Sequence, residues 1–146
     1  MTLVIIDMQN AYRASQIAEK TVLSQIQEFK KKKRWIVNVT LGHSKVLPSI
    51  TKVLKNYSKV IHVKKEYNDG TNWILAALKE HKLDASNLQI CGVNTNACVI
   101  DTVRGLHKTK RVKNLEIAVY GCASWNPSDH LYSLFNMGKL KKVSFV

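Results

Sequence analysis

Six short apolar runs alternate with five segments of helical periodicity, and this alternation constrains the fold more than any other feature of the chain. Several of the runs are apolar at consecutive positions, which is typical of parallel strands that are covered on both faces. We expect strands at residues 3–7, 35–40, 60–64, 88–93, 115–119 and 142–146. Strands that alternate with helices predict a three-layer α/β/α sandwich around a mostly parallel six-stranded sheet.

The helical segments carry their own start and stop signals. The first, over residues 14–33, has an apolar stripe and ends in a basic run, which suits the negative end of a helix dipole. The last begins at Asn126-Pro127, where proline fits the first helical position, and ends before Gly138. No repeat or low-complexity tract divides the 146 residues, so we expect a single domain over residues 1–146.

The chain is strongly basic, with 23 Lys and Arg against 10 Asp and Glu and a formal net charge of +13. Such a charge attracts polyanions without specificity. No RNA-binding aromatic motif, helix-turn-helix signature or zinc finger accompanies it, so we expect no specific nucleic-acid partner. No signal-peptide pattern or membrane-length apolar run is present, and the 3 Cys form no C-x-x-C pair. We therefore expect a cytoplasmic, reduced protein without a membrane partner.

Three reactive side chains fall at the ends of predicted strands. Asp7 ends the first strand, Lys64 ends the third, and Cys98 lies just past the fourth. Ligands of such sheets bind beyond the carboxyl ends of the strands. In the order 3-2-1-4-5-6 the first and fourth strands are neighbours about 4.8 Å apart, and the third lies about 10 Å from the first. A long lysine side chain can span much of that gap, so the three groups are expected to meet.

The choice of lysine stays open at this point. Lys65 follows Lys64 directly, and side chains alternate between the two faces of a strand, so only one of the two can enter the site.

Cys98 lies where a predicted strand passes into a predicted helix. Thr95 is a plausible N-cap, which would place Cys98 in the first turn of that helix. Free N–H groups and the positive end of the helix dipole would favour its thiolate and could also hold an oxyanion. A thiol, a carboxylate and a cation together make a workable acyl-transfer site.

Three stretches of the sequence resemble one known family. They are residues 3–12 (LVIIDMQNAY), residues 63–67 (VKKEY) and, most specifically, residues 90–102 (ICGVNTNACVIDT). They resemble the motifs of the isochorismatase-like cysteine hydrolases, which include nicotinamidases and N-carbamoylsarcosine amidases. The order and spacing of the three stretches fit along nearly the whole chain.

The resemblance implies a catalytic triad of Asp7, Lys64 and Cys98. It implies a cis peptide bond between Val93 and Asn94, and an oxyanion hole formed by the N–H groups of Asn94 and Cys98. The implied activity is hydrolysis of a C–N bond in a small amide or ureido substrate through a cysteine thioester. The resemblance also suggests a homo-oligomer and a substrate pocket lined by Tyr12, Tyr67 and Trp73.

Two departures from the family pattern bear on the substrate. The family's Asp-x-His metal motif is reduced to Leu41-Gly42-His43, so we expect no bound metal and no other cofactor. Its Ser-Ala-Phe stretch is replaced by Asn68-Asp69-Gly70, which removes an aromatic side chain from the expected pocket. Two other functions remain open: a catalytically inactive relative that binds a small ligand or partner, and a basic nucleic-acid-binding protein.

Overall fold

The computed structural model describes all 146 residues. Its strands are β1 (Thr2–Ile6), β2 (Ile36–Leu41), β3 (Val60–Lys65), β4 (Asn87–Val93), β5 (Asn114–Ala123) and β6 (Val143–Phe145). Its α-helices are α1 (Ala14–Lys31), α2 (Pro48–Leu54), α3 (Thr71–Glu80), α4 (Ile100–Lys108) and α5 (Pro127–Met137). A single π-helical turn, η1 (Thr95–Val99), leads into α4.

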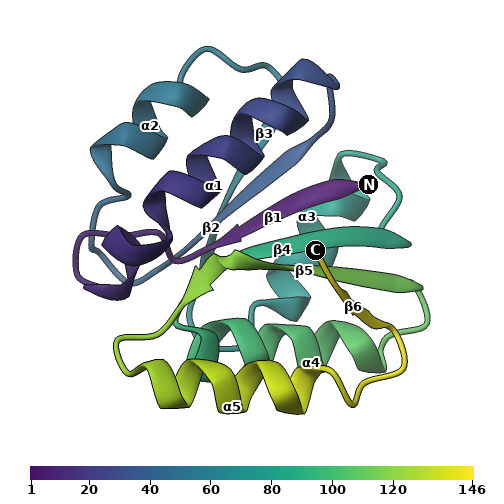
Figure 1. Cartoon of the computed structure of the whole chain (residues 1–146). Helices are drawn as coiled ribbons and strands as arrows, with labels where there is room; N and C mark the ends of the chain where they lie inside the picture. The colour runs from purple at the N-terminus through teal and green to yellow at the C-terminus, as the bar shows by residue number, and fades with distance from the viewer.

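The strands form one six-stranded sheet in the order β3-β2-β1-β4-β5-β6, and every neighbouring pair is parallel. This confirms the predicted α/β sheet and its strand order. Because β1 lies at the centre beside β4, the end of β1 and the start of η1 meet at one edge of the sheet (Figure 1).

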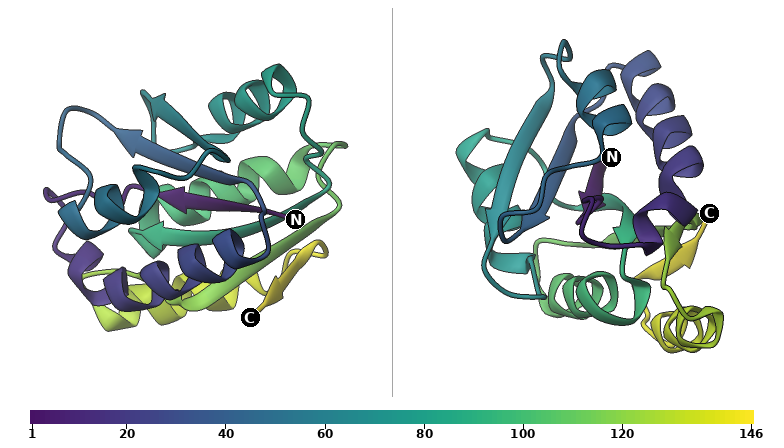
Figure 2. Two further views of the ribbon diagram at one scale, coloured as in Figure 1. Left: turned by 90° about the horizontal axis from the view of Figure 1, so that it is seen from above. Right: turned by 90° about the vertical axis from the view of Figure 1, so that its left-hand side faces the viewer.

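Helices cover both faces of the sheet, which makes the three layers seen in Figures 1 and 2. On one face, α1 and α2 pack their apolar stripes over side chains such as Leu3, Ile5 and Ile36. On the other face, α3, α4 and α5 pack over Val4, Ile6 and Val37. The alternation of β1 between the two clusters is the period of two expected for a strand buried on both sides. None of the helices has both the length and the apolar character needed to cross a membrane.

The strand bounds differ from the expected ones by a residue or two at most ends, except in β5. That strand runs four residues further than predicted, to Ala123, and its register with β4 shifts between Ile90 and Gly92. The expected third strand ended at Lys64, whereas β3 continues through Lys65. This one-residue extension matters because it places a second lysine in the pleat of the sheet.

A close approach between β1 and β4 fixes the geometry of the sheet edge. Gly92 has a φ of +124°, and a Cβ at that position would lie 2.0 Å from the Ile6 carbonyl oxygen. Only glycine fits there without a shift of the backbone. Asp7, which directly follows β1, has a φ of 51°, a left-handed conformation that aspartate tolerates better than most residues.

Candidate active site

A buried ion pair forms the centre of the site. Asp7 leaves the end of β1, and its Oδ2 lies 2.9 Å from Lys65 Nζ on β3, with both side chains 0% exposed. Lys65 Nζ also donates hydrogen bonds to the carbonyl oxygens of Tyr67 at 3.0 Å and Asn68 at 3.1 Å. The Lys65 ammonium group therefore has three oxygen neighbours, two through hydrogen bonds and one through the ion pair. The lysine therefore holds the carboxylate and the loop after β3 in one arrangement.

The structure corrects the assignment of the lysine. Lys64 was expected beside Asp7, but its side chain is exposed on the opposite face of β3, where its Nζ lies 3.5 Å from His43 Nδ1. Alternation along the strand is the physical reason, because consecutive residues point to opposite faces of the sheet. The alternative left open by the sequence, Lys65, is the residue that meets the carboxylate.

Cys98 reaches the same site from β4, which lies on the other side of β1 from β3. It lies in the turn η1, which follows β4, and its side chain is only 5% exposed. The turn is π-helical rather than the first turn of an α-helix, because Val99 N–H donates to the carbonyl of Asn94, five residues earlier. Thr95 is not the N-cap that we expected, since its hydroxyl contacts His130 Nδ1 at 2.9 Å instead.

Asn68 belongs to the site, although it was not among the expected site residues and was noted only in the stretch that replaces the family's Ser-Ala-Phe. The Cys98 thiol donates a hydrogen bond to Asn68 Oδ1 with a Sγ–Oδ1 distance of 3.5 Å. Thr102 on α4 fixes this loop, since its hydroxyl donates to the Asn68 carbonyl and accepts from the N–H of Gly70. The signal available in the sequence was the position of Asn68 directly after Tyr67, in a stretch that the family uses for its pocket.

The site holds the thiol in its neutral form. Burial and the neighbouring Asp7 carboxylate together raise the pKa of Cys98 to about 12, while Lys65 opposes the shift. This contradicts the expectation that the helix start would favour the thiolate, because desolvation disfavours an anion in a buried site. Burial also raises the pKa of Asp7, although the Cys98 thiol and Lys65 counteract that effect. The site therefore has the Asp7 carboxylate and the Cys98 thiol side by side, with the proton on sulfur.

One backbone donor faces no acceptor within the protein. The Val93–Asn94 peptide bond is cis, as the resemblance implies. The N–H of Asn94 donates to no backbone or side-chain acceptor, whereas the Asn94 carbonyl accepts from both Ala97 and Val99. Asn94 is half-buried and adjoins the turn that carries Cys98, so its N–H is available to a ligand at this edge of the sheet.

The three expected pocket aromatics differ in their relation to the site. Tyr12 lies close to the reactive groups: burial raises the pKa of its hydroxyl, and the charges of Asp7 and Cys98 raise it further. Tyr67 follows the site lysine, but its side chain is 68% exposed and its ring packs 5.8 Å from the Trp73 ring. Trp73 itself packs against the apolar core beneath α3.

The residues near the site do not fit a metal centre. No three His, Cys, Asp or Glu side chains cluster so that they could hold an ion. His43, the remnant of the family's metal motif, lies beside the Lys64 ammonium, which would repel a cation. The expected lack of a metal stays a prediction.

No protein-family model and no curated protein matches the sequence. Solved structures do match the fold. A nicotinamidase from Staphylococcus aureus superimposes with a TM-score of 0.85 over 99% of this chain and 97% of its own, at 18% sequence identity. An isochorismatase-like hydrolase from Alkaliphilus metalliredigens gives 0.81 over 99% and 90%, at 19% identity. A zinc-bound pyrazinamidase from Pyrococcus horikoshii gives 0.77 over 99% and 97%, at 18% identity.

These matches extend over nearly the full length of each chain, although fewer than one residue in five is identical. They agree with the strand order and with the family that the motifs around Asp7 and Cys98 resemble. The chain has the isochorismatase-like fold that nicotinamidases and isochorismatase-like hydrolases share.

Proposed function

We propose that this protein is a cysteine hydrolase that cleaves a C–N bond of a small amide or ureido substrate through a thioester on Cys98. The observation that carries the proposal is the meeting of three chemically matched groups in one buried site. Asp7 supplies a carboxylate, Lys65 an ammonium and Cys98 a thiol, from three segments far apart along the chain. A nucleophile beside a base that a third group orients is the common signature of covalent catalysis.

Asp7 acts as the general base in the first step. Because the pKa of Cys98 is about 12, the thiolate is scarce at neutral pH, and the proton must leave sulfur as the attack proceeds. Sγ forms a bond to the substrate carbonyl carbon while the proton passes to the Asp7 carboxylate. The carbonyl oxygen becomes an oxyanion, for which the N–H groups of Asn94 and Cys98 are the proposed donors.

The same carboxyl group then acts as an acid. Asp7 returns its proton to the substrate nitrogen as the C–N bond breaks, and the amine or ammonia departs to leave a thioester. Water attacks the thioester carbonyl and gives a proton to Asp7. The C–S bond breaks, the acid product leaves, and the proton returns to sulfur, so that the site is restored.

Lys65 and Asn68 position the reacting groups. The ammonium lies 2.9 Å from the carboxylate, which favours the ionised form of Asp7 that the first step needs. Asn68 holds the thiol through a hydrogen bond to its amide oxygen. Tyr12 would contact the substrate beside the nucleophile, whereas Tyr67 and Trp73 would form the outer rim.

The test is hydrolysis of a panel of small amides and ureido compounds, scored by release of ammonia. Wild-type protein is compared with Cys98→Ala and with Cys122→Ala, a matched control because Cys122 is a buried free thiol in β5. We expect turnover by the wild type and the control and none by Cys98→Ala. Intact-mass measurement after acid quenching should show an acyl adduct on Cys98. Turnover that survives in Cys98→Ala would refute the proposed nucleophile.

A catalytically inactive ligand-binding relative is the second candidate, and one observation favours it. The Cys98 thiol is 5% exposed and its pKa is raised, as in a buried structural cysteine. This candidate predicts that a small amide raises the melting temperature of wild type and Cys98→Ala alike, without ammonia release from either. An acyl adduct on Cys98 would exclude it.

We also propose that the protein is a homo-oligomer. The outer face of α5 exposes Leu131, Tyr132 and Phe135, each at least 64% exposed. Exposed apolar side chains grouped on one helix are typical of an interface. Light scattering after size-exclusion chromatography should show that Phe135→Lys shifts the wild-type oligomer towards monomer. A monomeric wild type would refute this proposal.

A further inference from the structure

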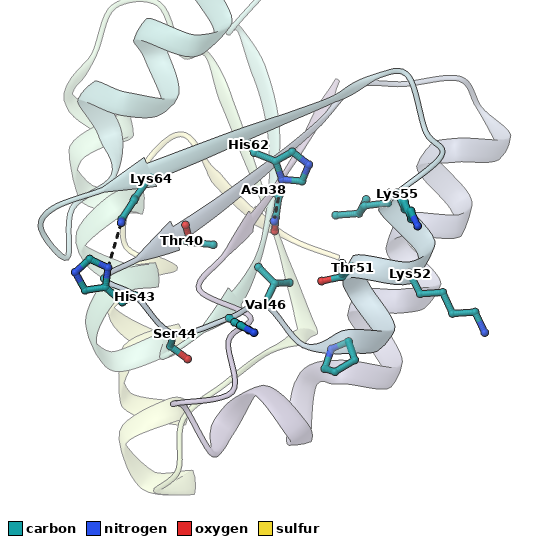
Figure 3. Close-up of a pocket in the computed structure, with 14 residues that line it drawn as sticks. Asn38, Thr40, His43, Ser44, Val46, Thr51, Lys52, Lys55, His62 and Lys64 are labelled. Carbon is teal, nitrogen blue, oxygen red and sulfur yellow. Dashed lines mark hydrogen bonds between the residues drawn. The ribbon is translucent and has the colours of Figure 1, made fainter.

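A basic cleft lies on the face of β3 opposite the ion pair. Its floor is the outer part of the sheet, where Asn38 pairs with His62 and Thr40 pairs with Lys64 across β2 and β3. Its walls are the loop after β2 and the helix α2, and its volume is about 1100 Å³ (Figure 3). Known small-molecule pockets occupy roughly 300–1000 Å³, so the cleft has room for a metabolite.

The charge of this basic cleft has one sign. The lysines that line it are Lys45 in the loop, Lys52 on α2, Lys55 at the C-cap of α2 and Lys64 on β3, and no Asp or Glu side chain lines it. Figure 3 shows Lys64 beside His43 at one end of the cleft and Lys52 and Lys55 at the other. Cationic groups on opposite walls suit a ligand with more than one anionic group better than a single small anion.

The residues that line the cleft favour a small ligand over a nucleic acid. It contains no Phe, Tyr or Trp side chain, although such rings are the usual platforms on which the bases of single-stranded nucleic acids stack. It does contain the hydroxyl groups of Thr40, Ser44 and Thr51, which can donate hydrogen bonds to phosphate oxygens. The chemistry therefore favours recognition of the phosphate groups themselves.

A buried amide in the cleft adds a second requirement for the ligand, which is a hydrogen-bond donor. Asn38 lines the cleft but is only 2% exposed, and its Oδ1 accepts no hydrogen bond from the protein. Its Nδ2 lies 3.4 Å from the Nδ1 of His62, so the other side of the amide is already engaged. A buried acceptor of this kind is stabilised by a donor, which a hydroxyl group of a ligand in the cleft would supply.

From this arrangement we propose that the basic cleft binds a small polyhydroxy compound that carries two or more phosphate groups. The phosphates lie between the lysines of α2 and those of the loop and β3. A hydroxyl group donates to Asn38 Oδ1. Lys65, Asp7 and Cys98 do not line the cleft, so this ligand is distinct from the proposed amide substrate.

The test is isothermal titration calorimetry with fructose 1,6-bisphosphate as the probe, compared with glucose 6-phosphate, inorganic pyrophosphate and a single-stranded RNA oligonucleotide. We expect the bisphosphate to bind at least about tenfold more tightly than the monophosphate, because it engages both walls. We expect it also to bind more tightly than pyrophosphate, which has no alcohol hydroxyl to donate to Asn38. Affinity should fall as salt is added. Equal affinity for the bisphosphate and the monophosphate, or tighter binding of the RNA, would overturn the proposal.

Two variants make the result specific to the cleft. Lys52→Glu/Lys55→Glu should weaken bisphosphate binding at least about tenfold, since it reverses the charge of one wall. Lys108→Glu/Lys110→Glu makes the same change in net charge at exposed positions at the end of α4 and is expected to bind as the wild type does. Equal losses of bisphosphate affinity in the two double variants would show that the overall charge attracts the ligand, and would overturn the proposed site.

Asn38→Ala tests the hydroxyl contact. We expect this variant to lose the preference for the bisphosphate over pyrophosphate while it still binds both ligands. Melting curves of every variant without ligand establish that it is folded before affinity is compared. A preference that persists in Asn38→Ala would overturn the assigned contact.

Discussion

The two faces of β3 carry adjacent lysines with opposite environments. Lys65 is fully buried and has three oxygen partners, one of them the Asp7 carboxylate. Lys64, one residue earlier, is exposed in a cleft that contains three further lysines and no carboxylate. The side chains are identical, so the difference arises only from the direction in which the pleated strand points each of them.

The comparison shows that a lysine cation can act in two ways, either on the folded structure or on anions in solution. A buried ion pair is costly to form because both charges lose water, but removing one partner leaves the other charged and unpaired. An exposed cation among other cations contributes little to folding, and its field acts on anions in solution. This difference supports the two proposals, which place the catalytic groups on the Lys65 face and the anion-binding cleft on the Lys64 face.

Lys65→Met and Lys64→Met should separate the two faces most strongly. The first variant leaves Asp7 buried without its cation, so we expect a loss of about 3–5 kcal/mol in the free energy of unfolding. The second should change the free energy of unfolding by less than about 0.5 kcal/mol. Urea denaturation followed by circular dichroism measures both. The rate of amide hydrolysis should fall at least about 100-fold further in Lys65→Met than in Lys64→Met. Equal effects of the two variants on the free energy of unfolding and on the rate would contradict the different roles given to the two lysines.

Asp7→Asn tests the base that Lys65 holds. Removing a general base is expected to lower kcat/KM by about 10²–10⁴-fold. In the wild type, activity requires the ionised carboxylate and should be lost as pH falls through the pKa of Asp7. Because burial raises that pKa, the acidic limb of the pH profile should have its midpoint above the ordinary value of 3.8. A midpoint at or below that value would contradict the assignment.

The reactivity of Cys98 should rise when catalysis is destroyed. The Asp7 carboxylate raises the pKa of the thiol, so Asp7→Asn should lower it and increase the thiolate fraction at pH 8–9. We expect iodoacetamide to label Cys98 several-fold to about tenfold faster in this variant than in the wild type, measured by peptide mass spectrometry. Unchanged labelling would mean that the carboxylate does not act on the thiol.

The smallest effect is expected for Asn68→Ala. A single neutral hydrogen bond contributes about 0.5–1.5 kcal/mol, so losing the contact to Cys98 should lower kcat about two- to tenfold. Asn136→Ala is the matched control and should keep the wild-type rate, since this half-buried amide on α5 hydrogen-bonds only within its own helix, to the Tyr132 carbonyl, and to Lys139. A kcat equal to that of the control would remove Asn68 from the site.

Much of the fold followed from local patterns in the sequence. Apolar runs interrupted by helical stripes were enough to predict the six strands, because strands buried on both faces need that composition. Their order was expected from the common doubly wound arrangement and from the family resemblance, and the structure confirms it. The placement of Asp7 and Cys98 at one sheet edge also followed, since each directly follows a central strand. Thr102, in the motif around Cys98, proved to fix the loop that carries Asn68.

Other features depended on contacts between distant segments. The choice of Lys65 over Lys64 required the register and the end of β3, which a pattern of two adjacent lysines does not reveal. The role of Asn68 required the loop after β3 to fold over the turn that carries Cys98. The expectation of a thiolate was wrong because the effect of a helix end was weighed without the burial that outweighs it.

The sequence by itself determined the alternation of strands and helices and the two chain positions from which Asp7 and Cys98 leave the sheet. The tertiary structure alone decided which lysine meets the carboxylate, where the proton of the thiol rests and how four other lysines come to line one cleft. The reason is physical: apolar periodicity is a local property of the chain, whereas burial and electric potential at a side chain depend on every segment that packs around it.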